Sequence, residues 1–152
     1  MITIKKSKPL PLVIPDGLLK KAAAEALRHQ LASDNTDLCI VLTDDAQLHE
    51  LNRDYLGVDA ATDVLSFPSE QIDPENGARY LGDILISVPR AAAQAAGSGH
   101  PVEAEAQLLV VHGVLHLLGH DHAEKDEKAR MWQAQIEILS RLGLADIQVR
   151  EE

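Results

Sequence analysis

The spacing of apolar residues changes from segment to segment along the chain, and each spacing predicts a helix or a strand. From Asp16 to Leu31 apolar residues recur at helical intervals, which predicts an amphipathic helix with Asp16 as its cap. The continuous apolar run at 38–43, bounded by polar turns, predicts a buried strand. By the same criteria we expect an edge strand at 2–4, a helix from 44 to Gly57, strands at 64–67 and 80–88, and helices at 89–96, 101–118 and 124–141.

The predicted helix at 101–118 differs from the others because its second half is apolar on every face. A helix that is hydrophobic all round is buried, so its side chains should project from the centre of the fold. The turn-rich loop between 64–67 and 80–88 predicts that these two strands pair antiparallel. Three or four strands with helices before and after them predict an α+β domain. We expect a single domain over residues 1–152, with 146–152 as a loose tail.

The predicted last helix combines charged residues with an apolar stripe. We expect the run of charges at 124–128 to be a solvated face of this helix. The stripe that should pack on the core consists of Ala129, Trp132, Ile136 and Leu139.

Four histidines stand within eleven residues where the buried helix is predicted to end. Residues four apart in a helix lie one above the other, so the imidazoles of His112 and His116 can converge on one ion. Gly119 predicts the end of the helix, because glycine just past the last turn commonly takes the left-handed conformation. A chain that turns there can bring back His122 as a third ligand. His120 would be the third histidine of a helix that continued, and Gly119 argues against continuation.

Three histidines with an open fourth position are typical of a catalytic zinc site. The spacing H-x3-H-x2-G-x2-H is also the ligand pattern of the metzincin peptidases. Gly113, however, stands where such a peptidase carries the glutamate that serves as its general base. The pattern therefore favours a zinc hydrolase acting on another bond, and imidazole ligands would also suit nickel, copper or iron.

The same segment resembles the signature of the YbeY family, metal-dependent bacterial endoribonucleases, in which it is written H-G-x-L-H-L-x-G-[aromatic]-D-H. Two residues depart from the family pattern: His120 replaces the usual tyrosine, and Leu56 replaces an arginine thought to serve catalysis. The resemblance extends from about residue 36 to the last helix, and it rests on two further blocks: Asn52 to Tyr55 with Asp59 and Thr62 to Pro68, and Leu81 to Ile84 with Ile86 and Ser87.

The resemblance implies a zincin-like fold, a small mixed sheet packed around a central helix, with His112, His116 and His122 holding one zinc ion. It also implies a single-strand-specific endoribonuclease that matures ribosomal RNA, notably the 16S rRNA 3′ end, and takes part in late ribosome quality control. Single-stranded RNA, ribosomal RNA and the ribosome would then be its partners. The alternatives are a metal-stabilised ribosome assembly factor without nuclease activity and a zinc hydrolase of another bond, including a peptidase.

Two residues are candidates for catalysis beside the metal. Arg53 lies one helical turn before Leu56, so it could supply the positive charge that stabilises the pentavalent phosphorane. Asp121 adjoins His122, and it could either take a proton or orient a ligand imidazole.

The formal net charge of -10, with 24 acidic and 14 basic residues, is unfavourable for binding a phosphate backbone. A cluster of Arg53, Arg79 and Arg90 near the metal, or a partner such as the ribosome that holds the substrate, would compensate. The single cysteine excludes an intramolecular disulfide. Without a signal peptide or an apolar run long enough to span a membrane, we expect a cytoplasmic protein.

Overall fold

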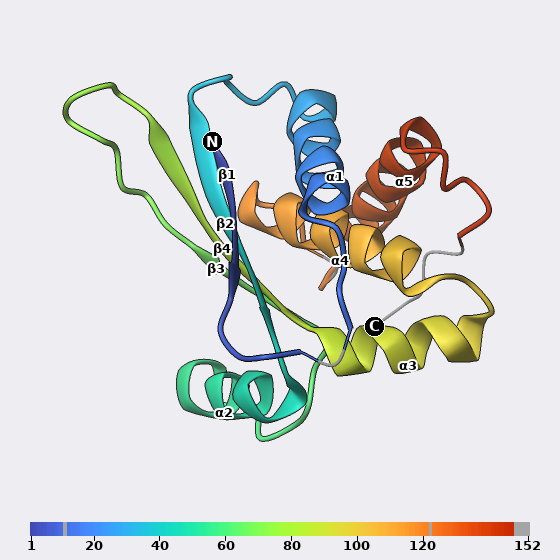
Figure 1. Ribbon diagram of the computed structural model, residues 1–152. Coiled ribbons are helices and arrows are strands. Elements are labelled where there is room, and N and C mark those ends of the chain that lie inside the picture. Colours follow the sequence, from blue (N-terminus) through green and yellow to red (C-terminus); the bar gives the residue numbers. More distant parts are fainter. Residues whose placement is uncertain (11, 122, 148–152) are drawn as a thin grey trace.

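The computed structural model describes residues 1–10, 12–121 and 123–147 (Figure 1). Each predicted helix and strand is found, with ends shifted by a few residues. The prediction that Asp16 caps the first helix is wrong, because Asp16 is its first helical residue and Pro15 occupies the capping position without a side-chain hydrogen bond. The elements in chain order are β1 (Ile2–Lys6), α1 (Asp16–His29), β2 (Thr36–Thr43), α2 (Asp45–Leu56), β3 (Val64–Pro68), β4 (Arg79–Ser87), α3 (Val88–Ser98), α4 (Val102–Leu117) and α5 (Lys125–Arg141).

The strands form one mixed sheet in the order β1-β2-β4-β3. The pairs β1–β2 and β2–β4 are parallel, whereas β3 and β4 are antiparallel, as the turn-rich loop between them predicted. β1 lies at an edge, which also agrees with the prediction. The fold is therefore a mixed α+β architecture, and the predicted class is confirmed.

The two faces of the sheet carry different helices, because alternate residues of a strand point to opposite sides. On one face Ile84 and Ile86 of β4 belong to the main hydrophobic core, and Figure 1 shows α1, α4 and α5 gathered on that side. On the other face Leu65 and Leu85 pack with Leu48 of α2 in a separate small cluster. Consequently α2 and α4 lie on opposite faces of the sheet.

α4 is a central buried helix, as its apolar sequence predicted. Every residue from Ala104 to Leu115 is buried. A Cβ atom at Gly113 would come within 2.7 Å of the Ile84 Cγ2 atom, so glycine allows α4 to pack this close to β4. The Ser66 hydroxyl of β3 donates to the Gly113 carbonyl at 3.3 Å and ties the helix to the sheet. No helix in the described residues is long and apolar enough to cross a membrane.

α5 buries only part of the predicted stripe: Leu139 belongs to the main core and Trp132 packs against it, as expected. Ile136 is 52% exposed, and Ala129 is exposed as well. Tertiary packing decides which side of the helix meets α4. The spacing of apolar residues alone did not fully identify that side. The face that is buried consists of Met131, Ala134, Gln135, Ile138 and Leu139.

The C-terminal segment follows the prediction only in part. Of the predicted loose tail at 146–152, residues 148–152 lie outside the described residues. Ile147 is partly buried against the main core.

Candidate metal centre

The last two turns of α4 bring two imidazole rings together. The Nε2 atoms of His112 and His116 face each other at 3.0 Å. Their rings meet edge to face, with 4.6 Å between centroids. Two nitrogens that each lie about 2.1 Å from a zinc ion can be at most about 4.2 Å apart, so the observed separation fits two ligands of one ion. The predicted pairing of these two side chains through helical spacing is therefore present in the structure.

The inner histidine of this pair is held by a residue on another helix. His112 is only 7% exposed, and its Nδ1–H donates to the Oε1 atom of buried Gln135 on α5 at 3.1 Å. A donor at Nδ1 leaves the Nε2 lone pair available to a metal ion, which is how protein metal sites fix the tautomer of a ligand. We did not single out Gln135 from the sequence. The signal that could have found it is a polar residue within the apolar face of α5.

The chain turns sharply after the pair. α4 ends at Leu117, and Gly119 has a φ of 99°, as the sequence predicted. The His120 Nε2–H donates to the Oε1 atom of Gln30 on α1 at 2.7 Å, so this side chain is engaged with another helix. Burial, followed by the charge of Arg130, lowers the pKa of His120.

The third predicted ligand, His122, lies outside the described residues. Among residues 1–10, 12–121 and 123–147, no cluster of three or more histidine, cysteine or carboxylate side chains that could hold a metal is found. The two histidines of α4 thus fit a metal site that needs a further ligand, and His122 stays the predicted one. Asp121 is exposed and borders a cavity of about 360 Å³ with His120 and Arg130.

Arg53 is not brought beside the histidine pair. It lies on α2, across the sheet from α4, and its Nε donates to the Asp54 carboxylate at 2.9 Å. That ion pair raises the pKa of the Arg53 guanidinium. Its predicted role in stabilising the phosphorane stays a prediction that this placement does not support.

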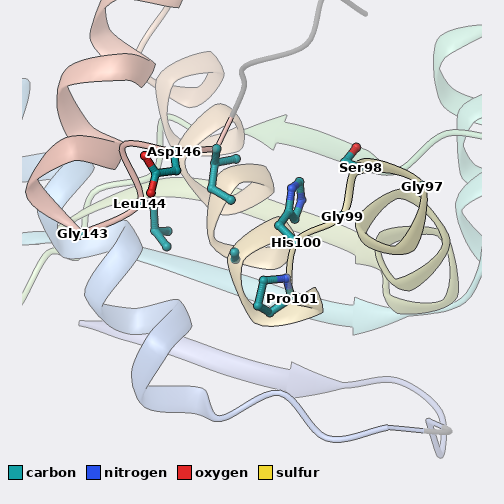
Figure 2. A pocket seen from close by; sticks show the side chains of 10 residues that line it. Gly97, Ser98, Gly99, His100, Pro101, Gly143, Leu144 and Asp146 are labelled. Carbon is teal, nitrogen blue, oxygen red and sulfur yellow. The ribbon is translucent and has the colours of Figure 1, made fainter.

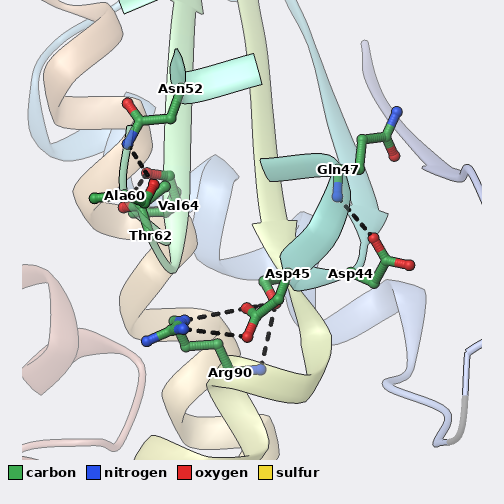
Figure 3. A network of polar contacts seen from close by, with 9 residues as sticks. Asp44, Asp45, Gln47, Asn52, Ala60, Thr62, Val64 and Arg90 are labelled. Atoms are coloured by element: carbon green, nitrogen blue, oxygen red, sulfur yellow. Dashed lines mark hydrogen bonds and ion pairs between the residues drawn. The ribbon is translucent and has the colours of Figure 1, made fainter. Parts of the chain in front are cut away.

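The expected cluster of three arginines does not form. Arg79 and Ser87 are the two ends of β4, which at about 3.3 Å per residue are about 26 Å apart. Arg90 follows Ser87 and binds Asp45 at the junction of α2 and α3, with 3.1 Å from Nε to Oδ1 and 3.2 Å from Nη2 to Oδ2 (Figure 3). Arg90 therefore stabilises the fold at that junction, far from Arg79.

A second pocket lies at the opposite end of α4 (Figure 2). This cavity of about 750 Å³ is lined by the loop between α3 and α4 and by the segment after α5. His100 Nε2 lies 2.7 Å from Oε1 of Glu105, a carboxylate that is fully buried. From Glu105 to His116 the helix rises about 16 Å, so this pocket is separate from the histidine pair.

Comparisons with known proteins agree with the resemblance in the sequence. The family model described as endoribonuclease YbeY matches residues 7–143. Proteins described as endoribonuclease YbeY are 46% identical in Desulfitobacterium hafniense over 84% of this chain and 85% of theirs, and 45% identical in Pelotomaculum thermopropionicum over 84% and 86%. A Thermotoga maritima protein with a known solution structure has a TM-score of 0.56 at 22% identity, covering 100% of this chain and 99% of its own, which shows the fold alone.

Proposed function

This chain belongs to the endoribonuclease YbeY family, and from that membership we propose that it is a metal-dependent endoribonuclease specific for single-stranded RNA. Its substrate would be ribosomal RNA, notably the 16S rRNA 3′ end, in maturation and in late ribosome quality control. Such a role makes the ribosome its partner and the cytoplasm its compartment. The observation that carries the proposal is the pair of imidazole nitrogens of His112 and His116, 3.0 Å apart on a buried helix.

The proposed ligands of a zinc ion are His112, His116 and His122. When bound there, the ion would act as a Lewis acid that activates water as a nucleophile near neutral pH and polarises a phosphoryl oxygen. Gln135 holds the His112 ring in the tautomer that coordination needs. Asp121, next to His122, either accepts a proton from the attacking water or orients the His122 ring.

A peptidase is disfavoured by the position of Gly113. A side chain at this residue would point at Ile84 of β4, since the Cβ atom alone would come within 2.7 Å of it. The general base that a zincin peptidase carries here therefore has no room and would face the sheet. An assembly factor without nuclease activity is not favoured either, because the relatives are described as endoribonucleases.

The test is to measure metal content and the cleavage of single-stranded RNA in the purified protein and in two histidine variants. His116→Ala should lose both the metal and the cleavage. His49→Ala is the matched control, because His49 is a half-buried histidine of α2 paired with Asp59, and it should keep both. Cleavage that persists in His116→Ala would overturn the proposed site, and metal binding without cleavage in the wild type would favour the assembly factor.

A further inference from the structure

α5 places a cation and an aromatic ring beside the histidine pair. Lys128 Nζ lies 5.7 Å from the centroid of the Trp132 ring. The Trp132 ring in turn stands edge to face with His112, with 6.3 Å between centroids and 81° between planes. Residues 128, 132 and 135 lie on one face of α5 because they are spaced four and three apart. This face thus runs from the Gln135 anchor of His112 out to the ammonium group of Lys128.

Lys128 and Trp132 are reachable from outside although Trp132 adjoins a buried histidine. Both side chains are half-buried, as is His116, the outer member of the pair. The run of charges at 124–128 is exposed at 124–126, as expected for a solvated face, whereas Glu127 and Lys128 are half-buried. The chain has one tryptophan and only 3% aromatic residues, and that tryptophan lies at the candidate metal centre.

The net negative charge of the chain makes the position of this lysine important for binding RNA. With a formal net charge of -10, the protein repels a polyanion overall, so binding of RNA depends on where individual cations lie. In the described part of the chain, Lys128 is a cation that stands over an aromatic ring in contact with a histidine of the pair.

We propose that Lys128 and Trp132 form an RNA-binding subsite next to the metal centre. The indole of Trp132 packs against an unpaired base, and the ammonium group of Lys128 pairs with a phosphate of the same strand. The proposal rests on the proposed function and adds the residues that select its substrate. A base inside a duplex is stacked on its neighbours and cannot reach the indole, whereas the bases of a single strand can.

Lys128→Met tests the charge, because it removes the ammonium group and keeps most of the apolar stem. The affinity for a short labelled single-stranded RNA is measured by fluorescence anisotropy over a series of salt concentrations, with and without a chelator that prevents cleavage. We expect several-fold weaker binding, and a logarithmic salt slope that is shallower by about 0.7, the value for one phosphate contact on a single strand. Arg141→Met is the matched control, because it removes an exposed charge about 20 Å further along the same helix.

Two substitutions of Trp132 test the aromatic ring. Trp132→Leu should weaken RNA binding about tenfold, whereas Trp132→Phe should stay within about threefold of the wild type, since stacking needs an aromatic face. The single tryptophan also reports directly, because its fluorescence should change on addition of single-stranded RNA and much less with a duplex of the same sequence. Thermal unfolding checks that each variant is folded. If the Leu variant is unfolded, the change in wild-type tryptophan fluorescence on addition of RNA still tests contact with the base.

The outcomes separate this subsite from the proposed function. Wild-type affinity and salt slope in Lys128→Met, or unchanged tryptophan fluorescence at saturating RNA, would overturn the subsite even if the protein cleaves RNA. Conversely, RNA binding that depends on both residues in a metal-loaded protein without nuclease activity would support the subsite and reject the endoribonuclease.

Discussion

The Oε1 atom of Gln135 lies 3.1 Å from Nδ1 of His112, although the two residues are 23 positions apart and belong to different helices. Both side chains are buried, with exposures of 1% and 7%. The bond orients the imidazole ring whose Nε2 atom faces His116. The geometry of the candidate metal centre therefore depends on how α5 packs against α4.

Replacing Gln135 by Leu should lower the affinity for zinc about 10- to 100-fold, the usual effect of removing the group that orients a metal ligand. Stability should also fall, by about 1–3 kcal/mol, because the buried His112 Nδ1–H loses its acceptor. Competition with a chelator measures the affinity, and urea unfolding measures the stability. Gln133→Leu, an exposed position of the same helix, is the control, and equal zinc affinities in the two variants would contradict the assigned role.

The choice between His122 and His120 as the third ligand can be decided by two alanine variants. His122→Ala should weaken zinc binding more than about 100-fold, since it removes a proposed ligand and not only its support. His120→Ala should change the affinity less than about threefold, because the His120 ring is bound to Gln30. The reverse order in a chelator competition would assign the ion to His120.

Gly113→Ala should destabilise the protein although alanine favours helices. The new Cβ atom would lie 2.7 Å from Ile84 Cγ2 in a closely packed core, and overpacking of this kind costs about 1–3 kcal/mol. The gain in helix propensity offsets up to about 1 kcal/mol of that. Gly97→Ala in α3, where a Cβ atom would meet nothing within 4 Å, should instead stabilise slightly. Thermal unfolding of both variants is the measurement, and a Gly113→Ala variant more stable than the wild type would refute the close contact.

The ionised Asp45 carboxylate should stabilise the fold at neutral pH, and this contribution should be lost in acid. Burial raises its pKa, but hydrogen bonds from Ser87 and Arg90 outweigh burial, so the pKa lies below its ordinary value. A depressed carboxyl pKa stabilises the fold above the unfolded-state value of about 3.9, and this contribution is lost as the pH falls through the native pKa. Because Asp45 is 43% exposed, the effect should stay below about 1 kcal/mol.

The measurement is the unfolding free energy of Asp45→Asn and the wild type between neutral pH and pH about 3. The variant should be less stable at neutral pH, and the difference should shrink toward acid. Arg90→Met should reproduce part of this loss, since it removes the same ion pair (Figure 3). A stability difference that is constant over the whole pH range would show that the carboxylate is not responsible.

Features that depend on local geometry could be predicted from the sequence. The convergence of His112 and His116 follows from the helical repeat, and the turn at Gly119 follows from the freedom of glycine. The antiparallel pairing of β3 with β4 followed from the loop that joins them. Each of these needs only residues close together in the chain.

Features that depend on the packing of distant elements could not be predicted in this way. Gln135 and Lys128 belong to the site through the rotation of α5 against α4. The apolar stripe gave that rotation only in part, since Trp132 and Leu139 pack on the core but Ile136 does not. Arg53 was assigned to the site because it lies one helical turn before Leu56, but α2 packs on the other face of the sheet. In the sequence, Gly113 is notable only because a zincin peptidase would carry a glutamate there. Its contact with Ile84 exists only once the sheet is formed.

The burial of α4 on all sides also determines which parts of the candidate metal centre can move. A helix enclosed by the core opens to solvent only when the whole domain unfolds, so the amide hydrogens of His112 and His116 should exchange at the rate of global unfolding. The two proposed ligands would then be held in place before any ion or substrate arrives. Any adjustment to the proposed RNA strand should then come from the outer turn of α5 that carries Lys128.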